Sequence, residues 1–146
     1  LYIIFFSVII WYYLNINSEN NFHLILLLSI CIFSDIGGYS FGKIIKGKKL
    51  TKISPKKTYS GMIGSYILPL LFCLFFFQHL NLNLNLVLLV IFVSTVSQIG
   101  DLFVSYLKRK AKIKDTGNFL PGHGGLLDRL DGILFAIPVG IFLISV

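Results

Sequence analysis

Long apolar runs separated by short polar segments make up most of this chain. The pattern predicts five membrane-spanning helices, at residues 1–14, 22–41, 62–80, 86–107 and 132–146. The three inner runs have about the 20 apolar residues that a helix needs to cross a bilayer. The first and last runs are shorter, so we expect truncated spans, or helices that rely on their neighbours and on thinning of the bilayer. The expected fold class is all-α, a polytopic membrane protein formed by one integral membrane domain over residues 1–146.

Composition supports a membrane protein and excludes an ordinary soluble domain. Hydrophobic residues make up 55% and charged residues 13% of the chain, against roughly 45–50% and about 25% in soluble domains. The net charge of +7 makes the few polar segments strongly basic, which suits anionic lipid, nucleotide phosphates or nucleic acid as partners. Cys31 and Cys73 lie inside apolar runs, where we expect small buried side chains rather than a disulfide.

All 13 Lys and Arg residues fall in two polar segments, residues 42–61 and 108–131. Two predicted spans separate these segments, so both lie on the same side of the membrane. An excess of Lys and Arg marks the cytoplasmic side. We therefore expect the basic segments to face the cytoplasm, and the Asn-rich connectors and the C-terminus to face outward.

Carboxylates next to the predicted spans suggest a metal site. Asp101 falls within the fourth span, and Asp128 and Asp131 precede the fifth. An ionised carboxylate in a span costs about 2.5–3.5 kcal/mol on insertion scales, so it usually faces a cavity, an ion or a partner cation. If the last helix has begun by residue 128, Asp128 and Asp131 project from one face. Mg²⁺ typically binds one or two carboxylates together with water and substrate phosphates, and no Cys and His cluster favours zinc. For Asp35, which also lies in a span, pairing with a nearby lysine at the interface stays an alternative.

Basic residues surround these acids, and such residues bind phosphate oxygens. They are Lys108, Arg109, Lys114 and Arg129. A glycine-rich turn at residues 121–125 includes Gly124 and Gly125 and lets the backbone approach a ligand closely. His123 in this turn would transfer a proton, orient a phosphate or only shape the turn. Together these features predict a metal and nucleotide site at the membrane surface.

A family resemblance rests on these residues. Residues 105–131 read S-x-L-K-R-x4-K-D-x-G-x2-L-P-x-H-G-G-L-x-D-R-L-D, which resembles the signature of the phosphatidate cytidylyltransferases, or CDP-diglyceride synthases. Residues 35–43 and 54–61 resemble two further family segments, D-x-x-A-Y-x-x-G-[KR] and S-P-x-K-T-x-E-G. Two positions differ, because Gly38 stands for the usual Ala and Ser60 for the frequent Glu.

The resemblance implies that CTP and phosphatidic acid react to give CDP-diacylglycerol and pyrophosphate, with Mg²⁺ required. It implies that the metal-binding aspartates are Asp101, Asp128 and Asp131. Members are integral inner-membrane proteins and commonly dimeric, so we expect a bacterial inner membrane location within the lipid bilayer, a cytoplasmic active site and a homodimer. Members are also longer at the N-terminus, so we expect this chain, which starts at Leu1, to be the C-terminal catalytic part of a longer architecture.

The predicted site divides into two groups of residues. The catalytic group, with the three aspartates as metal ligands, consists of Asp101, Asp128, Asp131, Lys108, Arg109, His123 and Arg129. The group that binds CTP or the lipid phosphate consists of Ser54, Lys56, Lys57, Thr58, Lys114, Gly124 and Gly125. A phosphate monoester is already a competent nucleophile, so the reaction needs charge neutralisation and positioning rather than a Ser or Cys nucleophile.

Two other functions stay open at this point. Another CTP-dependent lipid enzyme, such as a polyprenol kinase, would share a metal and nucleotide site but would release CDP instead of pyrophosphate. A non-enzymatic protein that binds anionic lipid would explain the basic segments but not the aspartates among them. A nucleic-acid partner is not expected, because few aromatic rings, Tyr59 and Tyr106 among them, are interleaved with the basic residues.

Overall fold

Five α-helices form the part of the chain that the structure, a computed structural model, describes. These residues are 2–16, 20–49, 57–76, 84–112 and 127–145, with the backbone alone for residues 127–129. The helices are α1 (Tyr2–Ile16), α2 (Asn20–Ile45), α3 (Tyr59–Phe76), α4 (Leu84–Lys110) and α5 (Leu127–Ser145). Within these ranges the only β pairing is one isolated bridge between Lys49 and Thr58. The all-α fold class is therefore confirmed.

The helices extend beyond the predicted spans at their polar ends. α2 continues to Ile45 rather than residue 41, α4 continues to Lys110 rather than residue 107, and α5 begins at Leu127 rather than residue 132. Apolar runs mark only the part of a helix that suits lipid, whereas charged residues can also be helical. In the last turn of α4, Lys108, Arg109 and Lys110 interact favourably with the negative end of the helix dipole.

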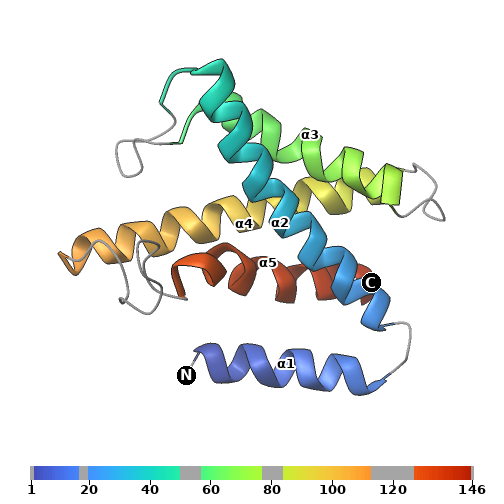
Figure 1. The fold of residues 1–146 in the computed structure, drawn as a ribbon. Helices are drawn as coiled ribbons and strands as arrows, with labels where there is room; N and C mark the ends of the chain where they lie inside the picture. The colour runs from blue at the N-terminus through green and yellow to red at the C-terminus, as the bar shows by residue number, and fades with distance from the viewer. Residues whose placement is uncertain (1, 17–19, 50–56, 77–83, 113–126, 146) are drawn as a thin grey trace.

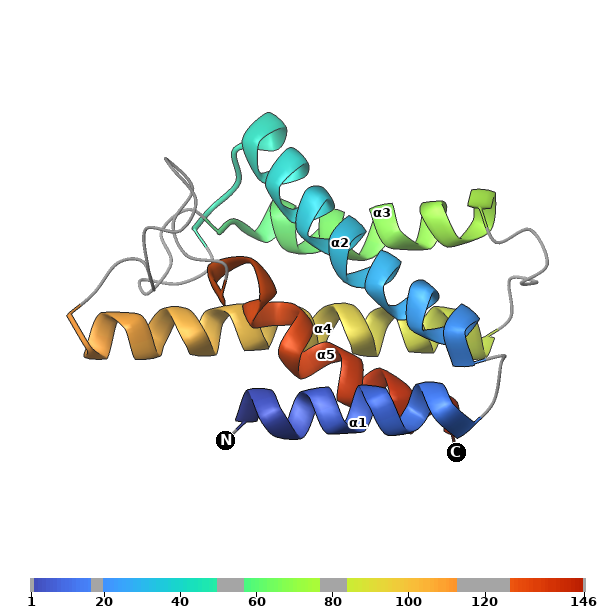
Figure 2. The same cartoon turned by 60° about the horizontal axis from the view of Figure 1, so that its bottom comes forward.

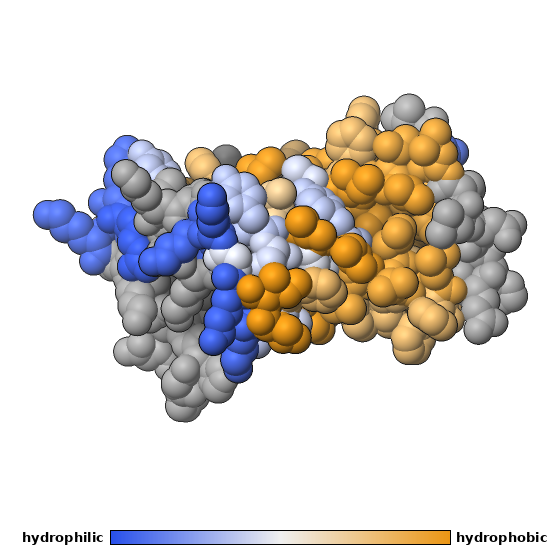
Figure 3. All heavy atoms as spheres, turned by 90° about the horizontal axis from the view of Figure 1, so that it is seen from above, coloured by the Kyte–Doolittle hydropathy of each residue, from blue (hydrophilic) through white to orange (hydrophobic). Residues whose placement is uncertain are grey.

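The helices suit a membrane by length and surface. Three of those described, α2, α3 and α4, are long and apolar enough to cross a bilayer, and two shorter apolar helices lie at Tyr2–Ile16 and Leu130–Ser145. Large apolar side chains cover much of the surface, and Ile4 and Phe76, for example, are 69% and 73% exposed. Figure 3 shows hydrophobic residues over one end of the molecule and hydrophilic residues over the other. Apolar surface on this scale suits lipid rather than water, so the chain is a polytopic membrane protein.

Successive helices run in alternating directions, as both ribbon views show (Figure 1 and Figure 2). The ends of α2 and α4 and the starts of α3 and α5 therefore lie towards one end of the bundle, which we call the polar end. The cations whose placement is described follow this arrangement, at Lys43, Lys46, Lys48, Lys49, Lys57, Lys108, Arg109, Lys110 and Lys112. The described cations of both basic segments thus lie on the same side, as the sequence predicts.

The core between the helices is apolar. Its fully buried side chains include Leu27 and Ile30 of α2, Val93 of α4 and Ile137 of α5. Cys31 and Cys73 are buried and free of disulfides, which confirms their predicted role as small buried side chains. This core fixes α2, α4 and α5 relative to one another below the polar end.

Glycines bring α2 and α3 into backbone contact. A Cβ atom added to Gly37 would meet the carbonyl oxygen of Gly64, and one added to Gly64 would meet the ring of Phe41. Small residues permit such close approach between membrane helices. The backbones of α2 and α3 therefore pack closely at these glycines, because no side chains separate them.

Gly38, the position where the related segment has Ala, has more room. A Cβ atom there would lie 3.7 Å from the Cβ of Ser65 and 3.8 Å from the carbonyl oxygen of Gly61. Because Ala is a better helix former than Gly by roughly 0.5–1 kcal/mol, we expect Gly38→Ala to unfold at the same temperature or a few degrees higher. Thermal unfolding of the detergent-solubilised protein measures this, and a clear fall in the midpoint would contradict the packing described.

Candidate active site

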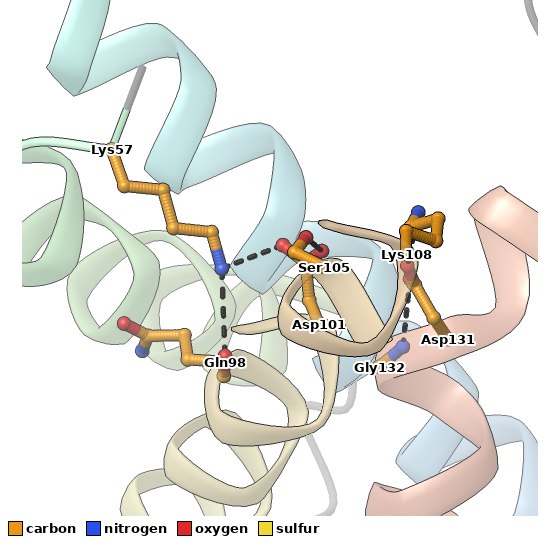
Figure 4. Close-up of polar contacts among 7 residues, drawn as sticks. All are labelled: Lys57, Gln98, Asp101, Ser105, Lys108, Asp131 and Gly132. Carbon is orange, nitrogen blue, oxygen red and sulfur yellow. Dashed lines mark hydrogen bonds and ion pairs between the residues drawn. The ribbon is translucent and has the colours of Figure 1, made fainter. Parts of the chain in front are cut away.

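Two aspartates lie where α4 and α5 pack together at the polar end (Figure 4). Each has a glycine beside it in the sequence, Gly100 before Asp101 and Gly132 after Asp131. A Cβ atom on Gly132 would lie 2.6 Å from Ser97 Oγ, and one on Gly100 would lie 3.2 Å from the carbonyl oxygen of Asp131. The glycines therefore allow the two helices to approach at the level of both carboxylates.

Asp101 of α4 pairs with Lys57, which lies just before α3. The Nζ atom of Lys57 is 2.6 Å from Oδ2 of Asp101 and donates to the carbonyl oxygen of Gln98 at 3.4 Å. Ser105, one turn further along α4, donates its hydroxyl to Oδ1 of Asp101 at 3.4 Å. The Lys57 and Asp101 side chains are 25% and 34% exposed, so the pair stays accessible to a ligand.

Local backbone pairing places Lys57. The amide of Tyr59 donates to the carbonyl oxygen of Lys48 at 3.1 Å, and Lys49 bridges to Thr58. These contacts tie the segment after α2 to the start of α3. Lys57 is thereby fixed at the edge of the polar end, with its side chain directed towards α4 (Figure 4).

Asp131 of α5 is 5% exposed. Its Oδ1 accepts a hydrogen bond from the amide of Gly132 at 3.0 Å, and its Oδ2 lies 3.6 Å from the Nζ of Lys108 on α4. A buried carboxylate is costly unless it is paired and hydrogen-bonded. Lys108 and the backbone of α5 supply those partners.

Asp35 of α2 belongs to the same electrostatic environment. The negative charge of Asp101 acts on both Asp35 and Asp131, and the positive charge of Lys57 acts on Asp35. Asp101 of α4 therefore lies within electrostatic range of acids on α2 and α5. The arrangement agrees with a nearby lysine as a partner of Asp35 and also places this residue beside the predicted site.

Four predicted site residues meet in this cluster, namely Asp101, Asp131, Lys57 and Lys108. Thr58 makes a different contact, because its hydroxyl oxygen accepts the amide of Gly61 at 3.1 Å and thus caps the start of α3. Arg109 is exposed on the last turn of α4. Successive residues of an α-helix lie about 100° apart around its axis, so Lys108 and Arg109 project from different faces of α4.

Other predicted residues lie outside the described part of the structure. These are Ser54, Lys56, Lys114, His123, Gly124 and Gly125, with the backbone alone described for Asp128 and Arg129. The start of α5 at Leu127 confirms that the last helix has begun by residue 128. Asp128 and Asp131 therefore occupy neighbouring positions on one helix, three residues apart.

Several polar groups near the site were not predicted. Ser105 contacts Asp101, while Ser34, Ser94 and Ser97 are buried, and each of these three hydroxyls lacks a hydrogen-bond partner within the described residues. The sequence does contain a signal for the serines of α4. Ser94, Ser97 and Asp101 follow helical spacing and form a polar stripe within an apolar span. Such a stripe indicates a helix face that turns inward rather than towards lipid.

The donor set suits a hard divalent cation. Among the residues with described side chains, no three His, Cys, Asp or Glu come close enough to hold a metal ion by themselves. Asp101 and Asp131 nevertheless offer carboxylate oxygens from two packed helices. Because Mg²⁺ commonly uses one or two carboxylates and fills its remaining positions with water and phosphate oxygens, the residues fit a magnesium site that a phosphate substrate helps to complete.

Comparisons with known proteins point to one family. A family model described as the cytidylyltransferase family matches residues 1–146. The phosphatidate cytidylyltransferase of Bacillus subtilis (strain 168) is 36% identical over 141 residues, which cover 92% of this chain and 52% of that protein. That of Rickettsia bellii (strain RML369-C) is 38% identical over 141 residues, covering 90% and 61%. That of Staphylococcus haemolyticus (strain JCSC1435) is 39% identical over 132 residues, covering 87% and 51%. The chain thus spans between about half and three fifths of the length of these relatives.

Proposed function

Because this chain belongs to the cytidylyltransferase family, we propose that it forms the catalytic part of a phosphatidate cytidylyltransferase. The reaction transfers CMP from CTP to phosphatidic acid and gives CDP-diacylglycerol and pyrophosphate. The meeting of Asp101, Asp131 and two lysines at the polar end of the bundle supports this proposal most directly. A membrane-embedded lipid phosphate and a water-soluble nucleotide can both reach that end.

The chemistry requires that two anions be brought together. An oxygen of the lipid phosphate forms a bond to the α-phosphorus of CTP, and the bond from that phosphorus to the oxygen bridging to the β-phosphate breaks. Pyrophosphate leaves with the bridging oxygen. The Lys57 and Lys108 ammonium groups can neutralise phosphate oxygens, and holding both substrates in place supplies much of the remaining rate enhancement.

We assign Mg²⁺ to Asp101, Asp128 and Asp131. Bound there, it would neutralise and orient the phosphates of CTP. In the proposed site, Lys108, Arg109 and Arg129 bind phosphate oxygens, and His123 transfers a proton or orients a phosphate. The proposed contacts to CTP or to the lipid phosphate come from Ser54, Lys56, Lys57, Thr58, Lys114, Gly124 and Gly125.

The polar end is proposed to face the cytoplasm of a bacterial cell. Its Lys and Arg residues fit the cytoplasmic side of a bilayer, and CTP is then available to the site. The relatives named above are bacterial, and the membrane proposed for this chain is accordingly the inner (plasma) membrane of a bacterium. Assembly into a homodimer, implied by the family resemblance, stays a prediction.

The proposed reaction is tested by asking which lipid accepts a group from CTP and which product is released. Membranes that contain the protein, supplied with CTP and Mg²⁺, are expected to form CDP-diacylglycerol from phosphatidic acid and to release one pyrophosphate per product. A chelator is expected to stop the reaction. Mass spectrometry of the lipid extract and a pyrophosphate assay measure both products. Phosphorylation of an added polyprenol with release of CDP would contradict the proposal and support a kinase, and turnover of neither acceptor would support a lipid-binding protein.

A further inference from the structure

The two carboxylates of the candidate site share one pattern of contacts. In Asp101, Oδ1 accepts from Ser105 of the same helix and Oδ2 pairs with Lys57 from a different element (Figure 4). In Asp131, Oδ1 accepts from the adjacent backbone amide and Oδ2 lies nearest Lys108 of another helix. Each acid thus has one oxygen oriented by its own helix and one neutralised by a lysine.

Lys57 makes the closer of these two ion pairs. Its Nζ lies 2.6 Å from Asp101, a short charge-assisted contact, whereas the Lys108 to Asp131 distance is 3.6 Å. Asp101 also lies within electrostatic range of Asp35 and Asp131. Lys57 places a positive charge directly beside Asp101, within this group of acids.

We propose that Lys57 is an exchangeable counter-ion, which pairs with Asp101 in the metal-free protein and transfers to a nucleotide phosphate when Asp101 accepts a divalent cation. This inference rests on the proposed function and on its magnesium site. Lys57 is then a positioning residue for Asp101 before substrate arrives and a phosphate ligand afterwards.

Electrostatics favours such an exchange if a metal ion binds Oδ2 of Asp101. Two cations at contact distance on one carboxylate oxygen repel each other, so the metal ion and Lys57 compete for Oδ2. The flexible four-carbon stem of Lys57 lets the ammonium group move without moving the backbone. The contact from Ser105 to Oδ1 can persist, so Asp101 keeps its orientation during the change. The phosphate that arrives with the nucleotide gives Lys57 a new anion.

If the exchange occurs, replacing Lys57 with an uncharged residue should have opposite effects on metal binding and on CTP binding. Loss of the Lys57 charge removes a competitor and should strengthen metal binding in the absence of nucleotide. The same loss removes a phosphate ligand and should weaken CTP binding. A purely structural lysine would weaken both, and a lysine that only bound phosphate would leave metal affinity unchanged.

Binding of Mn²⁺ alone, followed by electron paramagnetic resonance on the purified chain in detergent, tests the exchange. The matched control is Lys110→Met, which removes an exposed cation from the last turn of α4. We expect Lys57→Met to bind Mn²⁺ about tenfold more tightly than this control, which corresponds to about 1.4 kcal/mol. At saturating Mg²⁺, the KM for CTP is expected to rise about tenfold in Lys57→Met and to stay within about twofold in the control. Lys57→Arg keeps the competing charge and is expected to bind Mn²⁺ no more tightly than the unsubstituted protein.

Two outcomes separate this inference from the proposed function. Equal Mn²⁺ affinity in Lys57→Met and Lys110→Met overturns the exchange while leaving the cytidylyltransferase reaction intact. Absence of Mn²⁺ binding to the unsubstituted protein overturns the exchange together with the proposed magnesium site. If Lys57→Met does not fold, as judged by size-exclusion chromatography, Lys57→Gln provides the same comparison, because it removes the charge and keeps a polar side chain at this position.

Discussion

Asp101→Asn is expected to reduce the rate of CDP-diacylglycerol formation by about a hundredfold to a thousandfold, the usual loss when one preorganised electrostatic group is removed. The substitution removes the charge that pairs with Lys57 and is proposed to bind Mg²⁺, but it hardly changes the shape of the side chain. The asparagine oxygen can still accept the hydroxyl of Ser105. The initial rates of the variant and of the unsubstituted protein are compared with saturating CTP and phosphatidic acid, in membranes that contain equal amounts of each protein.

Glu19→Gln provides the matched control for this substitution. It makes the same carboxylate-to-amide change in the segment between α1 and α2, far along the chain from Asp101. Its rate is expected to stay within about twofold of the unsubstituted protein, as for a residue without transition-state contacts. Full activity in Asp101→Asn would show that Asp101 is no metal ligand.

Gly37→Ala is expected to lower the free energy of unfolding by about 2–3 kcal/mol, at the upper end of the range for overpacking a close contact. Its added methyl group would meet the carbonyl oxygen of Gly64 and would lie 3.0 Å from the Cβ of Leu68. Backbone atoms cannot rotate away as a flexible side chain can, so α2 and α3 must separate. Unfolding in detergent, followed by circular dichroism, measures the loss.

Gly38→Ala, one residue away on the same helix, controls for the change in helix propensity. Both substitutions add one methyl group to α2, but only the one at Gly37 meets the backbone of α3 closely. A large difference between the two variants is therefore expected. Equal stability of the two would contradict the backbone contact between these helices.

The five helices and the shared side of the basic segments could be predicted because their signals are local. Apolar runs indicate which residues suit lipid, and the positions of the lysines indicate which connections share one side of the membrane. Helix ends could not be found in this way, because the last turns of α2 and α4 contain charged residues that continue the helix beyond the apolar run.

The identities of the main site residues could be predicted, but their pairing could not. Asp101 and Asp131 stand out as acids beside apolar runs, yet the choice of Lys57 for one and Lys108 for the other depends on how distant parts of the chain pack. The contact that Thr58 makes could not be predicted from the sequence either. A threonine in a basic segment suggests a phosphate ligand, while the structure places its hydroxyl at the start of α3 as a cap, and its predicted role in binding stays a prediction.

The position of the transferred phosphorus tests the central claim most directly. Membranes containing the protein would be incubated with Mg²⁺, phosphatidic acid and CTP labelled with ³²P at either the α- or the γ-phosphate. A cytidylyltransferase places the α label in the lipid and the γ label in pyrophosphate. A lipid that gains the γ label and not the α label would contradict the account, because the chain would then transfer a phosphoryl group instead of CMP.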